Sequence, residues 1–368
     1  MPKINPDIQT FARIKVVGVG GGGGHALSRM MQAKIKGIDF IAINTDAQDL
    51  HHSEAPVKIH VGKNLTRGLG AGMDPEKGRQ AAEENRDEIH EALKGADMVF
   101  VTCGLGGGTG TGAAPVVAEA AKDSGALTLA IVTKPFVFEG AQRARIAEEG
   151  WQKLKDVVDA IITIPNDRLL QIIDRKTPLI EAFTMCDEVL RQGVQGISDL
   201  IMIPGLVNVD FADVKAIMQE AGSALMGVGI AQGEDRAVQA AKSAINSPLL
   251  DISIDGAKGV LFNVSGGPDL TMTEINEAAR IITESIDPDA KVIFGAVHDE
   301  NLKKGELKIT VIATGFDHQA PKLPLEEAAT APVAEKRPER RPVFKAEVSP
   351  VDETEEWDIP AFIRRKMH

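Results

Sequence analysis

The first candidates for chemistry are six glycines in the sequence VGVGGGGGHA, at positions 17 to 26. Backbone without Cβ atoms can approach an anion closely, and a helix that follows supplies free N–H groups and a positive dipole end. This loop therefore predicts a phosphate-binding turn. Gly18, Gly20 and Gly23 also satisfy GxGxxG, which is compatible with a dinucleotide-binding Rossmann enzyme that uses Asp46 to bind the ribose.

A second glycine loop, GLGGGTGTG at positions 104 to 112, follows an apolar run that ends at Cys103. It precedes a helical pattern of small residues, so it offers a second helix N-terminus to an anion. A Rossmann dehydrogenase needs one pyrophosphate loop, whereas two loops at the carboxyl ends of two strands suit a longer phosphate chain gripped from two sides. The usual P-loop sequence GxxxxGK[ST] does not occur in the chain.

Short apolar runs that alternate with helical patterns position both loops. This alternation predicts an α/β fold, in which a Rossmann-like parallel sheet carries helices on its faces. The expected strands are 14–19, 38–45, 96–104, 126–133 and 159–165, and the expected helices between them include 25–37 and 110–122.

A long helical stretch, roughly residues 178 to 200, separates this region from a second one. Its apolar residues lie on many sides, which predicts a helix buried between two domains. A smaller α+β domain should follow, and from Asp317 onward prolines and charges replace glycines, as is typical of a disordered linker. The expected divisions are 1–11 (N-terminal extension), 12–178 (first domain), 179–203 (central helix), 204–316 (α+β domain), 317–354 (disordered linker) and 355–368 (C-terminal peptide).

Composition and charge narrow the classes of function. The 368-residue chain is 43% hydrophobic and 26% charged, as in globular proteins, and has no apolar run long enough to span a bilayer. Its net charge of −12 argues against a general nucleic-acid binder. Cys103 and Cys186 lack metal-ligand spacing, so we expect buried free thiols. The first eleven residues mix polar residues and prolines with isolated apolar ones and lack the hydrophobic region of a signal peptide, so we expect a cytoplasmic protein without direct membrane insertion.

Several motifs, in order along the chain, resemble one known family. GGGTGTG after a strand is similar to the signature of the tubulin and FtsZ superfamily, and further segments resemble its bacterial division proteins. These segments are NTDAQ at 44–48, GLGAG at 68–72, KPFVFEG at 134–140, IPND at 164–167, NVDFADV at 208–214 and SPLL at 247–250. The resemblance covers about residues 12 to 316, and DIPAFIRRK is similar to the family's C-terminal peptide.

The resemblance implies a site for GTP and GDP. Phosphate contacts are implied for Gly21, Gly22, Gly23, Gly24, His25, Gly108, Thr109 and Gly110. His25 stands where the family usually has Asn. Glu139 would meet the ribose, Arg143 the ribose or phosphates, and Phe183 the base. From the residues alone, the spacing of Glu139 and Arg143 favours a solvent-exposed i,i+4 ion pair, and it is the resemblance that reverses this preference.

The guanine base would be recognised by Asp187. Guanine's N1–H and N2–H₂ are adjacent donors, so this carboxylate, with Asn166 nearby, can accept both, whereas adenine presents no such pair. Leaving the carboxylate buried and unpaired would disfavour ATP by about 1–3 kcal/mol. GTP is therefore the expected substrate. Mg²⁺ on its β- and γ-oxygens is expected from the chemistry of phosphoryl transfer, with its protein ligands unassigned.

Asn208, Asp210 and Asp213 carry two interpretations. Asp210 followed by Asp213 is typical of a capped helix with acids in its first turn. The resemblance instead implies that all three enter the nucleotide site of the next subunit, where the two acids would polarise the attacking water and Asn208 would help to position it. Hydrolysis would then require a head-to-tail contact between subunits, and such a contact generates open filaments.

The C-terminal peptide places Ile359, Phe362 and Ile363 on one helical face, followed by Arg364 and Arg365. This pattern is compatible with a frayed basic tail. The resemblance implies instead a segment that folds when it docks on membrane tethers and division regulators.

Taken together, the resemblance implies a filament-forming GTPase of the division ring in bacterial cytokinesis, at the inner face of the membrane at midcell. Two alternatives stay open. A Rossmann-type NAD-dependent oxidoreductase would bind nicotinamide independently of assembly, and a non-hydrolysing tubulin-like scaffold would not need Asp210 and Asp213.

Overall fold

The computed structural model describes residues 12–35, 37–171, 176–203, 205, 207, 209–247, 253–299 and 302–316. The N-terminal extension, the proposed linker and the C-terminal peptide lie outside these residues, as does Asn208. The predictions that concern them therefore have no structural counterpart below.

One sheet of ten strands runs through the described part of the chain, in the order β3-β2-β1-β4-β5-β6-β7-β10-β8-β9. The strands are β1 (Ile14–Val19), β2 (Ile38–Asn44), β3 (Val57–His60), β4 (Met98–Gly104), β5 (Leu127–Lys134), β6 (Ala160–Pro165), β7 (Gly222–Gln232), β8 (Gly259–Gly266), β9 (Lys291–His298) and β10 (Glu306–Thr314). From β3 to β7 every pairing is parallel, and the first six strands have the order of a Rossmann fold. The predicted fold class is confirmed.

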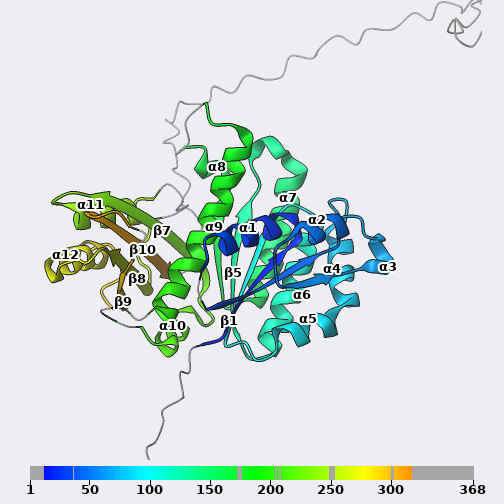
Figure 1. Cartoon of the computed structure of the whole chain (residues 1–368), viewed down its shortest axis with the longest axis horizontal. Coiled ribbons are helices and arrows are strands. Elements are labelled where there is room, and N and C mark those ends of the chain that lie inside the picture. The colour runs from blue at the N-terminus through cyan, green and yellow to red at the C-terminus, as the bar shows by residue number, and fades with distance from the viewer. Residues whose placement is uncertain are drawn as a thin grey trace, which may run out of the picture. The chain divides into compact units, whose positions relative to one another are not determined.

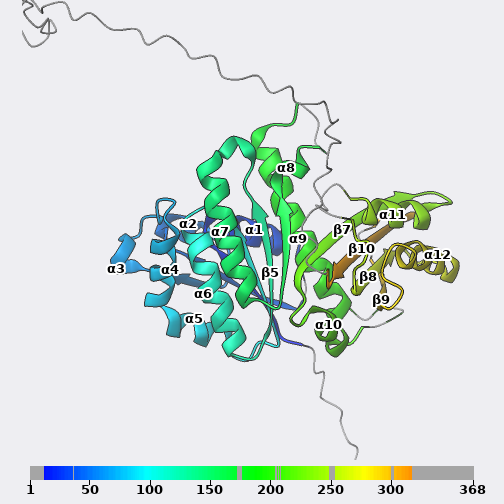
Figure 2. The same ribbon diagram turned by 180° about the vertical axis from the view of Figure 1, so that it is seen from behind.

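Helices cover both faces of this sheet (Figures 1 and 2). They are α1 (Gly20–Gln32), α2 (Ala47–His52), α3 (Lys63–Thr66), α4 (Pro75–Glu84), α5 (Arg86–Leu93), α6 (Thr109–Asp123), the 3₁₀ turn η1 (Val137–Glu139), α7 (Ala141–Val157), α8 (Asn166–Leu169), α9 (Leu179–Met202), α10 (Phe211–Met218), α11 (Arg236–Ile245) and α12 (Met272–Thr283). Alternate strand residues point to opposite faces, so Val16 packs with α1 and α9 while Val17 packs with α5 and α6.

The long helix α9 connects the two domains, as its apolar pattern predicts. Gly193 on α9 lies against Ile131 of β5, and Gly196 lies against Thr310 of β10. The sequence has a proline at position 204, and proline disfavours the continuation of a helix; α9 ends at Met202. A helix of 24 residues spans about 36 Å, so its two ends serve different regions of the molecule.

The smaller domain contains β7 to β10 with α11 and α12 around a third apolar cluster. Its strands β7, β10 and β8 pair antiparallel, and β8 pairs parallel with β9. The sequence predicts a separate α+β unit, and the structure adds that β7 also pairs with β6 through the three residue pairs that begin at Ala160 and Gly222. The strands of the two domains therefore form one continuous sheet.

Length and apolar character together decide whether a helix can cross a bilayer. Among the described residues, no helix combines the two to the degree that a crossing requires.

Candidate functional site

A cavity of about 780 Å³ opens at the carboxyl ends of β1 and β4, which is within the usual range for small-molecule sites. The strand order reverses between these two strands, and the crevice at such a switch point is where open α/β sheets bind ligands. Both glycine loops leave the sheet here. The fold therefore places the two loops on the wall of a single pocket, as their positions in the sequence predict.

The N-termini of α1 and α6 both line this cavity. Neither helix has a side-chain cap, and neither carries an acidic residue in its first turn. By contrast, α2, α4, α10 and α12 are capped by Asp or Thr side chains. The first N–H groups of α1 and α6 are thus open to an external acceptor, and their dipoles favour an anion between them.

The loop glycines divide into two groups by what a Cβ atom would meet. At Gly23 a Cβ would lie 2.4 Å from the carbonyl oxygen of Thr102, and at Gly18 it would lie 2.5 Å from that of Gly23. These glycines allow α1 to pack against β1 and β4. Gly107 lines the cavity, yet nothing lies within 4 Å of its Cβ position and its φ is ordinary. The protein's own packing does not require that glycine, and a ligand that approaches the backbone would.

Most of the residues predicted to contact phosphate lie on the wall of the cavity. Gly21, Gly22, His25, Gly108, Thr109 and Gly110 line the cavity. Gly23 lies behind it against β4, and Gly24 faces a small adjoining hollow. Thr109 is held in place by a hydrogen bond of 2.6 Å between its hydroxyl and that of Thr45.

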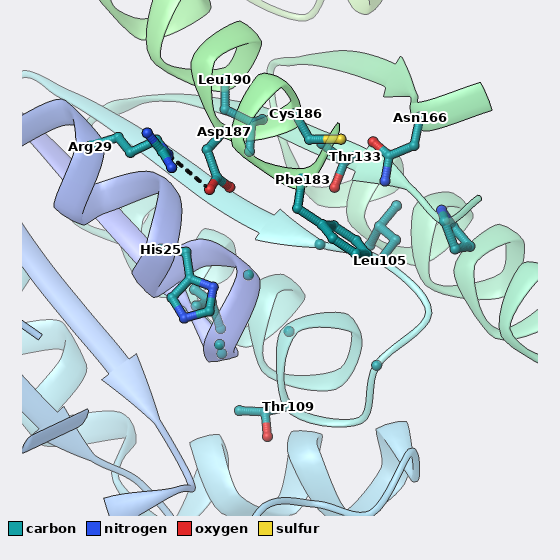
Figure 3. Close-up of a pocket in the computed structure, with 18 of the residues that line it drawn as sticks. His25, Arg29, Leu105, Thr109, Thr133, Asn166, Phe183, Cys186, Asp187 and Leu190 are labelled. Carbon is teal, nitrogen blue, oxygen red and sulfur yellow. Dashed lines mark hydrogen bonds and ion pairs between the residues drawn. The ribbon is translucent and has the colours of Figure 1, made fainter. Parts of the chain in front are cut away.

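The opposite end of the cavity has the features of a base-binding site (Figure 3). Phe183 is 40% exposed there and meets Phe136 edge-to-face at 5.5 Å, so an aromatic surface is available for stacking. Asn166 is buried, and its Oδ1 has no hydrogen-bond partner within the described part of the protein. A buried acceptor without a partner is costly, and a donor from a ligand would satisfy it.

Asp187 on α9 faces Arg29 on α1 across this end of the cavity (Figure 3). Arg29 Nε donates to Asp187 Oδ2 at 3.2 Å, and its Nη2 donates to Thr184 Oγ1 at 2.8 Å. Burial raises the pKa of Asp187, and the neighbouring Arg29 opposes that rise. Among the described residues Asp187 Oδ1 accepts no hydrogen bond, and Oδ2 keeps a second lone pair, so the carboxylate can still accept from two adjacent donors.

Glu139 and Arg143 form the i,i+4 ion pair that their spacing predicts, and both also line the cavity. Glu139 is mostly buried, and its second oxygen accepts from the backbone N–H of Phe136 at 3.0 Å. The pair is therefore part of the cavity wall, not of a solvated helix face.

The acidic pair Asp210 and Asp213 lies away from the cavity. Asp210 caps α10 by accepting from the N–H of Ala212 at 3.4 Å, and Asp213 occupies the first turn of that helix. Both are exposed. The helix α9 lines the cavity up to Leu190 and ends at Met202, and α10 follows it at the far end (Figure 1). Within one chain the structure brings these acids and the pocket to different ends of α9.

Several cavity residues escape analysis of the sequence. Gly107 lies inside the motif GGGTGTG, whereas Arg29, Thr184 and Ile180 belong to none of the motifs described above. Arg29 follows His25 by four residues and shares its helix face, a spacing that could have indicated it.

Asp46, the candidate ribose ligand, and the two cysteines were the other residues of chemical interest in the sequence. Asp46 caps α2 by accepting from Gln48 N–H at 2.9 Å and does not line the cavity, which gives the dehydrogenase alternative no support. Cys103 and Cys186 are free and buried, as predicted, and burial raises the pKa of each thiol to about 12. The described residues contain no group of three or more His, Cys, Asp or Glu side chains that could hold a metal ion.

Comparison with known proteins shows which family has this fold and this arrangement of glycine loops. The profile of the Tubulin/FtsZ family GTPase domain matches residues 13–174, and that of the FtsZ family C-terminal domain matches residues 222–317. The chain is similar to the solved structure of an FtsZ dimer from M. jannaschii, with 50% identity and a TM-score of 0.80 over 83% of this chain and 89% of that one. The chain belongs to the FtsZ family.

Two further solved structures extend the comparison. A point mutant of FtsZ from M. jannaschii is also 50% identical, with a TM-score of 0.80 over 83% of this chain and 92% of that one. CetZ2 from Haloferax volcanii, solved as a GTPgS-bound protofilament, is 23% identical with a TM-score of 0.71 over 83% and 94%, so it shares the fold alone. As a member of the FtsZ family, the chain is a guanine-nucleotide-binding GTPase of the tubulin-like cytoskeleton.

Proposed function

We propose that this FtsZ-family protein hydrolyses GTP in a site that two subunits share. One subunit binds GTP in the cavity, and the next subunit of a head-to-tail filament inserts Asp210, Asp213 and Asn208. The filament would form the division ring in the cytoplasm, at midcell and at the inner face of the membrane.

One observation carries the proposal: the pocket and the candidate acids occupy opposite ends of α9. Among the described residues, the carboxylates that line the cavity are Asp187 and Glu139, and each already has an arginine partner. Both oxygens of Glu139 already accept hydrogen bonds, from Arg143 and from Phe136 N–H, and the free oxygen of Asp187 lies at the base-binding end, so we do not assign either acid to the attacking water. Asp210 and Asp213 are exposed at the far end, where a second subunit could present them to a neighbour's nucleotide.

Hydrolysis of GTP needs little covalent chemistry from the protein, because placement and charge stabilisation account for most of the catalysis. The glycine loops and the N-termini of α1 and α6 would hold the phosphates, and Phe183, Asn166 and Asp187 would hold the base. The partner's acids would polarise the water that attacks the γ-phosphorus, and GDP and phosphate would leave. Mg²⁺, held by phosphate oxygens and water, would supply charge neutralisation.

The rim of the cavity supports a subunit contact. Large apolar side chains are exposed there in the η1 segment, after α8 and at the start of α9, and Phe138, Phe136 and Phe183 form a chain of ring contacts. The exposed residues are Val137, Phe138, Leu170, Leu179, Ile180 and Phe183. Exposed apolar surface beside a functional pocket is typical of a protein interface.

We further propose that Ile359, Phe362 and Ile363 of the C-terminal peptide dock on membrane tethers and division regulators, aided by Arg364 and Arg365. These residues lie outside the described part of the chain, and the proposal rests on their pattern in the sequence. Deletion of residues 355–368 should abolish recruitment to membranes that carry a tether and leave GTP turnover unchanged.

The decisive experiment measures GTP turnover and pelleting against protein concentration for wild type and Asp213→Ala. Turnover per protomer should rise with concentration in the wild type, and Asp213→Ala should bind GTP and pellet while its turnover falls by about a hundredfold or more. Asp87→Ala is the matched control, because Asp87 is also an exposed acid in the first turn of a helix. Turnover that is independent of concentration would refute the divided site.

Mixing two inactive variants tests the same proposal independently of concentration. Asp213→Ala keeps its pocket, and Asp187→Ala keeps its acids. Random head-to-tail mixing should restore up to about one quarter of the wild-type rate, since one contact in four combines an intact pocket with an intact acid pair. A mixture no more active than its components would contradict the proposal. Equal activity of Asp213→Ala and wild type would favour a site complete within one chain.

A further inference from the structure

His25 is the one histidine on the wall of the large cavity, among the described residues that line it. It lies on α1 directly after the glycines, its side chain is 69% exposed, and it also faces an adjoining hollow of about 80 Å³. Histidine is the side chain whose ordinary titration falls between about pH 5 and 8, so a histidine beside a bound anion can couple binding to protons.

The charged groups around His25 come from three helices. On α2, Asp49 Oδ1 lies 3.9 Å from His25 Nε2, too far for a hydrogen bond, and Asp49 Oδ2 accepts from Asn44 Nδ2 at 2.6 Å. His52 on α2 shares the adjoining hollow. On α1 and α9, Arg29 and Asp187 are paired with each other. Within the described residues, His25 therefore has a carboxylate in its neighbourhood but no hydrogen-bonded partner that fixes its protonation state.

A bound nucleotide changes this balance. The positive end of the α1 dipole disfavours a cation on the first turns of that helix, and an anion held at the helix N-terminus cancels the effect. The phosphates also bring several negative charges into the cavity that His25 lines. Each of these changes favours the imidazolium over the neutral imidazole.

We propose that His25 couples nucleotide binding to proton uptake, so that this FtsZ-family site binds guanine nucleotides more tightly as the pH falls from about 8 to 6. The proposal rests on the proposed nucleotide site. The coupling is reciprocal: if protonation of His25 strengthens binding, then binding favours protonation of His25 to the same degree.

The test measures the dissociation constant of GDP, which the protein does not hydrolyse, between about pH 6 and 8.5. The terminal phosphate of GDP itself titrates in this range, and this contribution is common to all variants. The ratio between wild type and His25→Gln isolates His25: wild type should gain about tenfold in relative affinity from the high to the low end. His52→Gln is the matched control and should follow the wild type.

Two further measurements make the outcome unambiguous. His25→Lys carries a permanent charge, so it should bind GDP tightly and change with pH in parallel with His25→Gln. Calorimetry in two buffers of different ionisation heat should show that the wild type takes up more protons than His25→Gln at about pH 7.

The possible failures are distinguishable. If wild type and His25→Gln bind GDP with the same pH dependence and the same proton uptake, the coupling is refuted and the nucleotide site stands. If every folded variant fails to bind GDP at any pH, the proposed function is refuted together with this inference.

Discussion

Two ion-paired clusters, one in each domain, differ in how completely they are satisfied. In the smaller domain Arg236 is 6% exposed and donates to Asp269 and Glu274, while Glu274 also accepts from the N–H and the hydroxyl of Thr271, each at 2.8 Å. In the pocket Asp187 has one cationic partner among the described residues, Arg29. We call Arg236, Asp269 and Glu274 the closed cluster, because its charged groups satisfy one another. We call Arg29 and Asp187 the open cluster, because Asp187 keeps a carboxylate oxygen without a hydrogen bond among the described residues.

The pKa shifts of the two carboxylates have opposite signs for this reason. Hydrogen bonding to Arg236 lowers the pKa of Glu274 to about 2, whereas burial raises the pKa of Asp187. A buried acid that its own protein satisfies stabilises the fold, and one left partly unsatisfied favours a ligand with donors. The comparison thus predicts that mutations in the two clusters affect different measurements.

Arg236→Met should have the largest effect on stability. It leaves two carboxylates without their cation, and we expect the free energy of unfolding to fall by about 2–4 kcal/mol with no change in GDP affinity. Because the pKa of Glu274 is lowered on folding, its contribution is present above about pH 4.5 and is lost as the pH falls toward 2. Denaturant unfolding at several pH values measures this.

The exposed pair of Arg280 on α12 and Glu284, the residue that follows this helix, supplies the control, since exposed pairs contribute little. If Arg236→Met lost no more stability than Arg280→Met, the closed cluster would have no special role.

Asp187→Asn should affect binding instead of stability. The new amide presents an N–H₂ group to guanine's donors, so GTP affinity should fall by about 1–3 kcal/mol, or roughly 5- to 150-fold. The same amide can donate to the C2 carbonyl of xanthine, so affinity for xanthosine triphosphate should rise. Competition between the two nucleotides measures this, and an unchanged preference would remove Asp187 from base recognition.

The sequence predicts one part of this comparison and not the other. The order of strand, glycine loop and helix locates both loops at one edge of the sheet, because each part of that pattern is local. The pairing of Arg29 with Asp187 joins residues 158 positions apart, and no local pattern encodes it. The different roles of Gly23 and Gly107 likewise depend on what packs against each of them, which only the folded chain decides.

Arg29→Met tests how the open cluster keeps its acid ionised. Without Arg29, neither its hydrogen bond nor its charge opposes burial, so the pKa of Asp187 should rise further and the carboxylate should protonate at a higher pH than in the wild type. Since only the ionised form accepts from both guanine donors, GTP affinity should fall about three- to tenfold more between pH 7 and 5 than in the wild type. Arg13→Met, which removes an exposed partner of Asp97, should not alter this pH profile.

Asp199 lies twelve residues after Asp187 on α9 and is half-buried. Burial raises its pKa from 3.8 to about 6, because its charged neighbours only partly offset the loss of solvent. The native state therefore binds a proton more readily than the unfolded chain. Above about pH 6 the charged carboxylate lowers the free energy of unfolding, and below about pH 4 this loss disappears. Asp199→Asn should raise the free energy of unfolding by about 1 kcal/mol at pH 8, less than the full shift implies because the side chain keeps some contact with solvent. Thermal unfolding at pH 8 and pH 4 measures this, with Asp87→Asn as an exposed control on α5. If the free energy of unfolding of Asp199→Asn exceeded that of the wild type by as much at pH 4 as at pH 8, ionisation of Asp199 would not be the cause.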